Sequence, residues 1–138
     1  MRHRELRFRP DPNGFDVADL LIDTDVFIDH IRGTHRLEIP RRKAVLYSVV
    51  TRCELLSGRG IEDNTVHRLL EPFSELVINR PVAERAGRLR RHLDILTPDA
   101  LIAATALEHG LTLWTRNVRH FRGVPGLRVE VPLRRPAH

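Results

Sequence analysis

Apolar residues along this chain fall into two kinds of pattern. Short runs rich in apolar and β-branched residues alternate with longer stretches in which apolar positions recur every three or four residues. A short apolar run is typical of a strand buried on both faces of a parallel sheet, and helically spaced positions predict amphipathic helices. The predicted strands lie at 20–22, 45–50, 76–78, 111–115 and 127–131.

Local signals indicate where several helices begin and end. Gly33 is expected to end a first helix, because glycine is a common helix terminator. The Thr-x-x-Glu sequence at 51–54 matches a capping box that opens a second helix, and a helical stripe follows across 61–76. Pro81 suits the first turn of a later helix.

A further helix is expected at 99–109. The Thr97-Pro98 pair predicts its start, with the threonine as capping hydroxyl and proline at the first position. Because this helix is apolar nearly all round, it must be substantially buried. A short helix is also expected at 117–121. Alternating strands and helices predict an α/β fold, a parallel sheet with helices on both faces.

The chain has 138 residues, which fits one domain. The predicted elements place that domain at 20–131. Residues 1–19 are polar and basic and contain prolines and a glycine, so we expect a mobile tail without elements of its own. Residues 132–138 form a polar C-terminal tail.

Composition excludes several classes of protein. No run approaches the roughly 18 apolar residues that a membrane span needs, and no apolar segment follows the basic N-terminus as in a secretory signal. Cys53 is the only cysteine, which excludes an internal disulfide and a cysteine-based zinc site. We therefore expect a cytoplasmic protein.

The net charge is +5, and only one of the 23 basic residues, Lys43, is a lysine. A basic surface favours a polyanionic partner such as nucleic acid, and arginine binds phosphate through a bidentate fork. The same arginine-rich composition would also arise from codon bias in a GC-rich genome, so charge alone does not identify the partner.

Three acids stand at positions where α/β proteins bind ligands. Asp23 follows the first predicted strand, Glu54 lies one helical turn beyond the second, and Asp99 opens the buried helix. Each also has an ordinary explanation: Asp23 caps a helix, Glu54 closes its capping box, and Asp99 complements the helix dipole. If the three converge, two carboxylates about 4 Å apart repel by about 4 kcal/mol at an effective dielectric constant near 20. Such a cluster needs protonation or a cation, and oxygen ligands suit Mg²⁺ or Mn²⁺.

Four segments of the chain resemble the motifs of one protein family. They lie at 21–33, 48–58, 97–107 and 113–121, in the family's order and with compatible spacing. The resemblance is to PIN-domain ribonucleases, specifically VapC-type toxins of type II toxin–antitoxin systems, and it covers about residues 20–131. It implies a PIN-like three-layer α/β/α sandwich around a central, mostly parallel sheet of about five strands.

The resemblance implies that Asp23, Glu54 and Asp99 are the acidic metal ligands, with Mg²⁺ or Mn²⁺ as cofactor. Asn117 stands where the family often has a fourth acid, and His120 where a further aspartate is common. Asn117 can still bind a metal through its amide oxygen, but it lacks the negative charge. The choice between one and two metal ions therefore stays open.

The implied reaction is hydrolysis of RNA phosphodiester bonds by a metal-activated water. Thr24 and Thr115 could orient waters at the metal, or they could serve only as cap hydroxyls. Arg116 and Arg119 flank Asn117 and could grip substrate phosphates, or they could be solvated surface charges.

The resemblance also implies a homodimer and a cognate antitoxin whose peptide covers the site. The apolar stripes of 51–76 are the expected groove for this peptide, unless they simply pack into the core. The expected partners are therefore RNA, an antitoxin and a second copy of the chain, without a membrane.

Two other functions compete with this interpretation. The Asp23-Thr24-Asp25 sequence mimics the nucleophile motif of haloacid-dehalogenase-like phosphatases, although that family prefers threonine or valine at the position of Phe27 and needs a later lysine and acidic pair. The second alternative is a catalytically weak or dead PIN module that binds RNA or antitoxin, because Asn117 replaces an acid.

Overall fold

A computed structural model gives the structure of this protein and describes residues 9–10, 16–17, 19–39 and 44–132. The predictions of a mobile tail at 1–19 and a polar tail at 132–138 lie largely outside these residues. Two short strands, β1 (Arg9–Pro10) and β2 (Asp16–Val17), pair antiparallel where the sequence analysis predicted no element. No helix in the described part of the chain is long and apolar enough to cross a membrane.

A five-stranded parallel sheet forms the centre of the domain, as predicted. Its spatial order is β5-β4-β3-β6-β7, with β3 in the middle and every neighbouring pair parallel. The carboxyl ends of the strands therefore meet at one edge of the sheet. The strands are β3 (Leu20–Ile22), β4 (Val45–Ser48), β5 (Ser74–Leu76), β6 (Thr112–Trp114) and β7 (Val129–Glu130).

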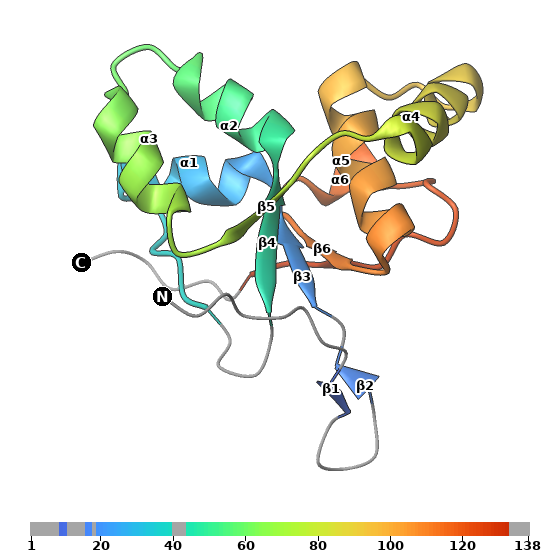
Figure 1. The fold of residues 1–138 in the computed structure, drawn as a ribbon, viewed down its shortest axis with the longest axis horizontal. Helices are drawn as coiled ribbons and strands as arrows, with labels where there is room; N and C mark the ends of the chain where they lie inside the picture. The colour runs from blue at the N-terminus through green and yellow to red at the C-terminus, as the bar shows by residue number, and fades with distance from the viewer. Residues whose placement is uncertain (1–8, 11–15, 18, 40–43, 133–138) are drawn as a thin grey trace.

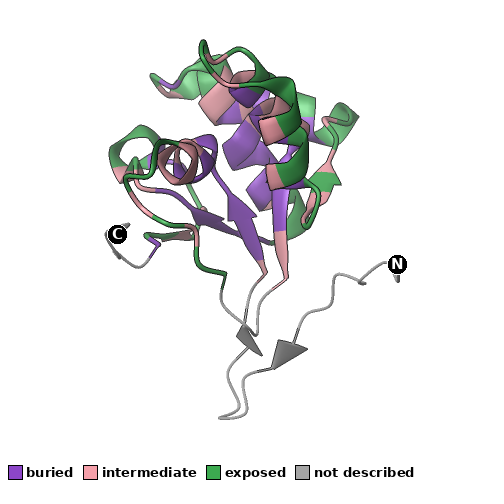
Figure 2. Ribbon diagram, turned by 90° about the vertical axis from the view of Figure 1, so that its left-hand side faces the viewer, coloured by how far each residue is buried: buried purple, intermediate pink, exposed green. Residues whose placement is uncertain are grey.

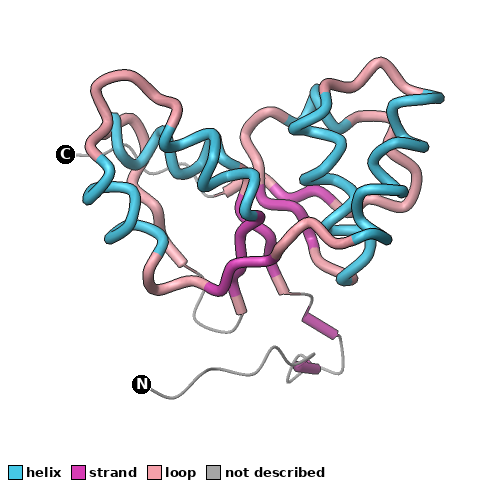
Figure 3. The backbone as a smooth tube through the Cα atoms, turned by 45° about the horizontal axis from the view of Figure 1, so that its top comes forward, coloured by secondary structure: helices cyan, strands magenta, loops and turns pink. Residues whose placement is uncertain are grey.

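In the described part of the chain, six helices cover the two faces of this sheet, which confirms the three-layer α/β/α architecture (Figure 1, Figure 3). The helices α1, α2 and α3 lie on one side, and α4, α5 and α6 lie on the other. Their bounds are α1 (Thr24–Arg32), α2 (Val49–Leu56), α3 (Asp63–Leu70), α4 (Arg80–His92), α5 (Thr97–His109) and α6 (Val118–Phe121).

The alternation of side chains along β3 divides the core in two. Leu20 and Ile22 pack with Phe27 in a cluster beneath α1–α3, whereas Leu21 packs in the cluster beneath α4 and α5. Successive residues of a strand point to opposite faces, so three consecutive apolar residues supply both clusters. Buried residues accordingly line the sheet and the inward helix surfaces (Figure 2).

The predicted third strand at 76–78 is wrong in position, because the observed strand is Ser74–Leu76. Its partner β4 ends at Ser48, which pairs with Leu76 in the ladder. Beyond Leu76 the edge strand has no neighbour to pair with, and Val77 is exposed.

Two predicted helix caps are also wrong. The hydroxyl of Ser48 caps α2 by accepting from Val50 N at 3.0 Å, so the helix starts before the expected capping box at 51–54. In α5 the cap position belongs to Leu96, and Thr97 is already the first helical residue. Serine and threonine can both cap a helix through their hydroxyl groups. The backbone conformation therefore decides which residue near the helix start takes the cap position.

Candidate active site

Asp23 lies at the carboxyl end of β3, in the middle of the sheet. Its Oδ1 accepts a 2.8 Å hydrogen bond from the backbone N–H of Thr24 and caps α1, so the capping explanation of this residue is correct. Its Oδ2 accepts a 2.8 Å hydrogen bond from the Thr115 hydroxyl at the end of β6. The residue is only 4% exposed. Asp23 therefore joins two adjacent strands at the edge where ligands bind in such sheets.

Burial first, and then the negative charges of Asp25 and Asp99, raise the pKa of Asp23 to about 8. The hydrogen bonds from Thr115 and from the Thr24 backbone act in the opposite direction, because they stabilise the ionised carboxylate. Asp23 is thus a carboxylate in a crowded negative field.

Asp25 belongs to the same site, although its sequence position was interpreted only as part of the phosphatase motif. Its Oδ2 accepts a 2.9 Å hydrogen bond from the backbone N–H of Arg116, and the Thr115 hydroxyl lies 3.4 Å from both carboxylate oxygens. Burial raises the pKa of Asp25. A second acid two residues after Asp23, in the same strand-to-helix turn, was the available sequence signal.

Asp99 approaches the site from the first turn of α5. Burial raises the pKa of Asp99, a positive charge on His120 lowers it, and the charge of Asp25 raises it. The Nδ1 atom of His120 lies 3.4 Å from Asp99 Oδ2. The charges of Asp25 and Asp99 act on the pKa of Asp23, and the charge of Asp25 acts on that of Asp99, so the three acids interact electrostatically.

Glu54 connects to this region through Thr24. The Thr24 hydroxyl donates to Glu54 Oε1 at 2.7 Å and lies 2.9 Å from the hydroxyl of Thr51. Glu54 is half-buried in the second turn of α2 and does not close a capping box. The buried Thr24 hydroxyl is engaged by protein groups, so the turn after β3 and the helix after β4 are tied together.

Asn117 occupies the cap position of the short helix α6 without making a side-chain capping bond. Its backbone N–H donates to Thr115 Oγ1 at 3.0 Å, which orients that hydroxyl toward Asp23. The Asn117 side chain is exposed and is therefore available to a ligand.

The two predicted phosphate-binding arginines have different surroundings. The Arg116 side chain is only 13% exposed, and its NH1 lies 3.5 Å from Oδ2 of Asp29 on α1. Two of its guanidinium nitrogens are buried without a hydrogen-bond partner among the described residues. Arg119 is exposed. The geometry favours a structural position for Arg116 and leaves Arg119 accessible.

The donor set fits a hard cation better than any other cofactor. Among the described residues, no three acidic, histidine or cysteine side chains are placed to hold a metal ion by themselves. Mg²⁺ commonly uses only one or two carboxylates and keeps several waters, so it does not need a group of three protein ligands. Burial and, to a smaller extent, repulsion between the acids raise the pKa values of Asp23 and Asp99, and a divalent ion would oppose both effects by stabilising the ionised carboxylates.

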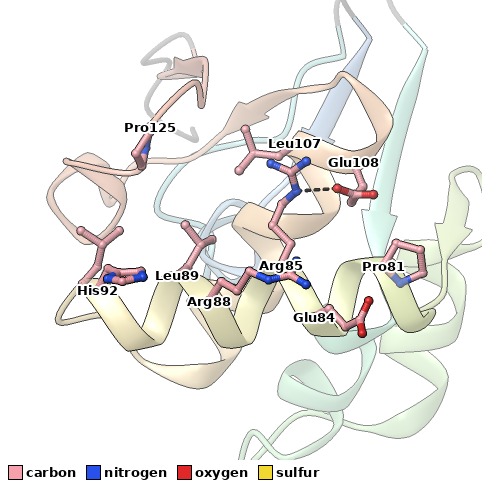
Figure 4. A pocket seen from close by; sticks show the side chains of 10 residues that line it. Pro81, Glu84, Arg85, Arg88, Leu89, His92, Leu107, Glu108 and Pro125 are labelled. Atoms are coloured by element: carbon pink, nitrogen blue, oxygen red, sulfur yellow. Dashed lines mark hydrogen bonds and ion pairs between the residues drawn. The ribbon is translucent and has the colours of Figure 1, made fainter.

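A cavity of about 600 Å³ lies away from these acids (Figure 4). It opens between α4 and α5, where Leu89 and Leu107 contribute apolar walls and Arg85 pairs with Glu108. None of the acids described above lines it, so cavity size does not mark the chemistry of this protein.

Comparisons with known proteins agree with the fold. The model of the PIN domain family matches residues 20–127. Ribonuclease VapC10 of Mycobacterium tuberculosis is 39% identical over 113 residues, which cover 74% of this chain and 85% of that protein. Ribonuclease VapC19 of the same species is 35% identical over 121 residues, covering 78% and 95%. A structure titled a toxin–antitoxin complex from Klebsiella pneumoniae superimposes with a TM-score of 0.69 and 34% identity, covering 85% of this chain and all of that one.

Proposed function

The chain belongs to the PIN-domain family, and we propose that it is a VapC-type ribonuclease toxin that hydrolyses RNA phosphodiester bonds with Mg²⁺ or Mn²⁺. The observation that supports the proposal is the electrostatic interaction among Asp23 at the end of β3, Asp25 in the turn that follows and Asp99 in the first turn of α5. Acids that only cap separate helices do not need to interact with one another. Acids that bind one cation for phosphate chemistry must lie close enough to interact.

In this proposal Asp23 and Asp99 would hold the ion, with Glu54 binding it directly or through water. When bound, the ion would supply Lewis acidity and a more acidic water for hydrolysis of the phosphodiester. Thr115 keeps Asp23 oriented, and Thr24 fixes Glu54. Asp25 holds the backbone at Arg116, so the loop carrying Asn117 stays beside the acids. The exposed Arg119 is available to bind a substrate phosphate.

A cognate antitoxin is the second part of the proposal, supported by the toxin–antitoxin complex among the similar structures. The apolar stripe at 51–76 divides between two environments. Leu55 and Leu70 are fully buried in the core, whereas Leu69 and Phe73 line an open cavity of about 540 Å³ beside α1. We propose this cavity as the groove for an antitoxin peptide, and a homodimer as the assembly.

The phosphatase alternative has no support among the comparisons, since the matched family is the PIN domain. Lys43, its candidate lysine, lies outside the described residues. The catalytically dead module remains as an outcome of the test below.

The test is RNA cleavage with Mg²⁺ or Mn²⁺ by the wild-type chain, Asp23→Ala and Asp99→Ala. We expect each substitution to lower the rate by about 100-fold or more, because a preorganised charge at the reacting phosphate is lost. Glu62→Ala is the matched control, since this exposed residue caps α3 without a side-chain bond. Cleavage that survives a chelator would contradict metal dependence, and RNA binding without cleavage would favour the inactive module.

A further inference from the structure

A second cavity, of about 380 Å³, opens directly beside the site acids. Its wall consists of residues from the α4–α5 connection at 93–96, residues from 119–124, and Asp99. Asp99 and His120 therefore belong both to the active site and to this cavity. Anything bound in it would lie next to the phosphate that the proposed ion holds. The volume falls within the roughly 300–1,000 Å³ of small-molecule sites.

Two arginines without a partner in the described part of the chain line the cavity. Arg119 and Arg122 are exposed, and neither guanidinium has a hydrogen bond or ion pair within the described part of the chain. Both forks are thus available, unlike that of Arg116. Arginine binds phosphate in bidentate fashion, and contacts to phosphate oxygens position a nucleic acid without reading its sequence.

The lining also includes apolar side chains. Leu96 is 68% exposed, an unusual position for a large aliphatic side chain, and it stands at the cavity with Ile95 and Val124. An unstacked base offers a flat apolar face, and proteins recognise RNA sequence mainly on such splayed single-stranded bases. The apolar side chains suit a base and the two arginines suit a phosphate, next to the proposed active-site acids. Together these groups match one nucleotide.

We propose that this cavity binds the nucleotide adjacent to the scissile phosphate of a single-stranded RNA, with its base against Leu96 and Val124 and its phosphate on Arg119 and Arg122. The inference rests on the proposed ribonuclease function and deepens it by assigning a subsite to the substrate. The acids of the cavity are Asp94 and Asp99, and the latter faces the proposed ion. An anionic phosphate is therefore expected at Arg119 and Arg122 rather than at the two acids.

The test uses the full chain and a pool of single-stranded RNA with a randomised central segment, whose cleavage sites are read by sequencing. Leu96→Ala should weaken the base preference at one position next to the cut by roughly three- to tenfold, the scale of a small change in an apolar pocket. Val77→Ala is its control, because Val77 is 62% exposed outside the cavity.

Arg122→Ala should reduce the dependence of log(kcat/KM) on log[salt] by about 0.7, the value for one phosphate contact on a single strand. Arg59→Ala, which removes an exposed arginine between α2 and α3, should leave that slope unchanged. All four side chains are exposed, so the variants are expected to fold.

Failure of the inference is distinguishable from failure of the proposed function. If the wild-type chain cleaves the pool and both cavity variants match their controls, the nucleotide subsite is wrong and the ribonuclease stands. If the wild-type chain cleaves none of the pool, the proposed ribonuclease function is wrong, and the nucleotide subsite is wrong with it. If the variants cleave normally but escape inhibition by antitoxin, the cavity belongs to the antitoxin, and the inference is overturned.

Discussion

The hydroxyl of Thr115 donates a 2.8 Å hydrogen bond to Oδ2 of Asp23, although 92 residues separate the two in the chain. The bond joins the ends of β6 and β3, which are neighbours in the sheet. It is one of the interactions that hold down the pKa of a carboxyl group that burial raises. The ionisation of Asp23 therefore depends on a side chain from a distant motif.

Thr115→Val should raise the pKa of Asp23 further, because it removes a hydrogen bond that favours the charged form. A bond to a charged group contributes about 1.5–3 kcal/mol, which corresponds to roughly one to two pH units. The measurement is the affinity for Mn²⁺ as a function of pH. The midpoint of this pH dependence should move to higher pH in the valine variant. Thr115→Ser keeps the hydroxyl and should keep the wild-type midpoint; identical midpoints in both variants would contradict the assignment.

The raised pKa of Asp23 also predicts how the stability of the metal-free protein varies with pH. The folded protein keeps a proton up to about pH 8, whereas the unfolded chain releases it near the ordinary value of 3.8. This contribution to stability is fully present below pH 3.8 and is lost as pH rises to about 8. In the presence of a chelator, Tm should therefore fall between pH 5 and pH 8.

Asp23→Asn should remove most of that fall, and at pH 8 it should raise Tm by roughly 5 °C or more relative to wild type. Added Mg²⁺ should raise the Tm of the wild-type chain at pH 8 and have little effect on the asparagine variant. Glu62→Gln is the control that should leave the pH dependence intact. A parallel fall in Tm for wild type and Asp23→Asn would refute the linkage.

Thr24→Val should disconnect Glu54 from the site. The substitution removes the 2.7 Å bond to Glu54 and the 2.9 Å contact with Thr51, which leaves polar groups without their partner. Denaturant unfolding should show a loss of about 1–3 kcal/mol, accompanied by slower RNA cleavage. Thr24→Ser restores a donor and should recover both quantities; a fully active valine variant would exclude a role for this bond.

Substitutions of Arg116 and Arg119 should have different effects, the first on stability and the second on substrate binding. Arg116→Ala leaves the half-buried Asp29 without its 3.5 Å cation neighbour and should cost about 1 kcal/mol of stability. Arg119→Ala should leave Tm unchanged and lower the salt dependence of RNA cleavage. Thermal unfolding and a salt series on both proteins provide the comparison, and an unchanged salt slope in Arg119→Ala would count against its phosphate contact.

Asn117→Asp should strengthen binding of a divalent ion, because it restores an acid where the family often has one. The exposed amide makes no capping bond, so the substitution leaves α6 intact. A carboxylate 4 Å from a divalent ion in water interacts with it by about 2 kcal/mol, or roughly 30-fold in affinity. Mn²⁺ titration followed by calorimetry measures it, with Asn117→Ala as the uncharged control. Equal affinity in the two variants would show that position 117 lies outside the ion's reach.

The sequence by itself determined the elements and the positions of the acids along them. The apolar run 20–22, the terminator Gly33 and the near-uniform apolar helix of α5 are local signals, because strand and helix periodicities arise from the backbone. These signals placed Asp23 after a strand and Asp99 in the first turn of a helix, as observed. Cap choice at Ser48 was missed, because several nearby hydroxyls satisfy the same pattern.

Only the tertiary structure decided which of these groups meet. The order β5-β4-β3-β6-β7 places Thr115 beside Asp23, and no periodicity encodes which strands become neighbours. Contacts between distant segments likewise bring Asp25 into the site, link Thr24 to Glu54 and bury Arg116. Local sequence sets backbone conformation, but burial and electrostatic interaction depend on what packs around each group after folding.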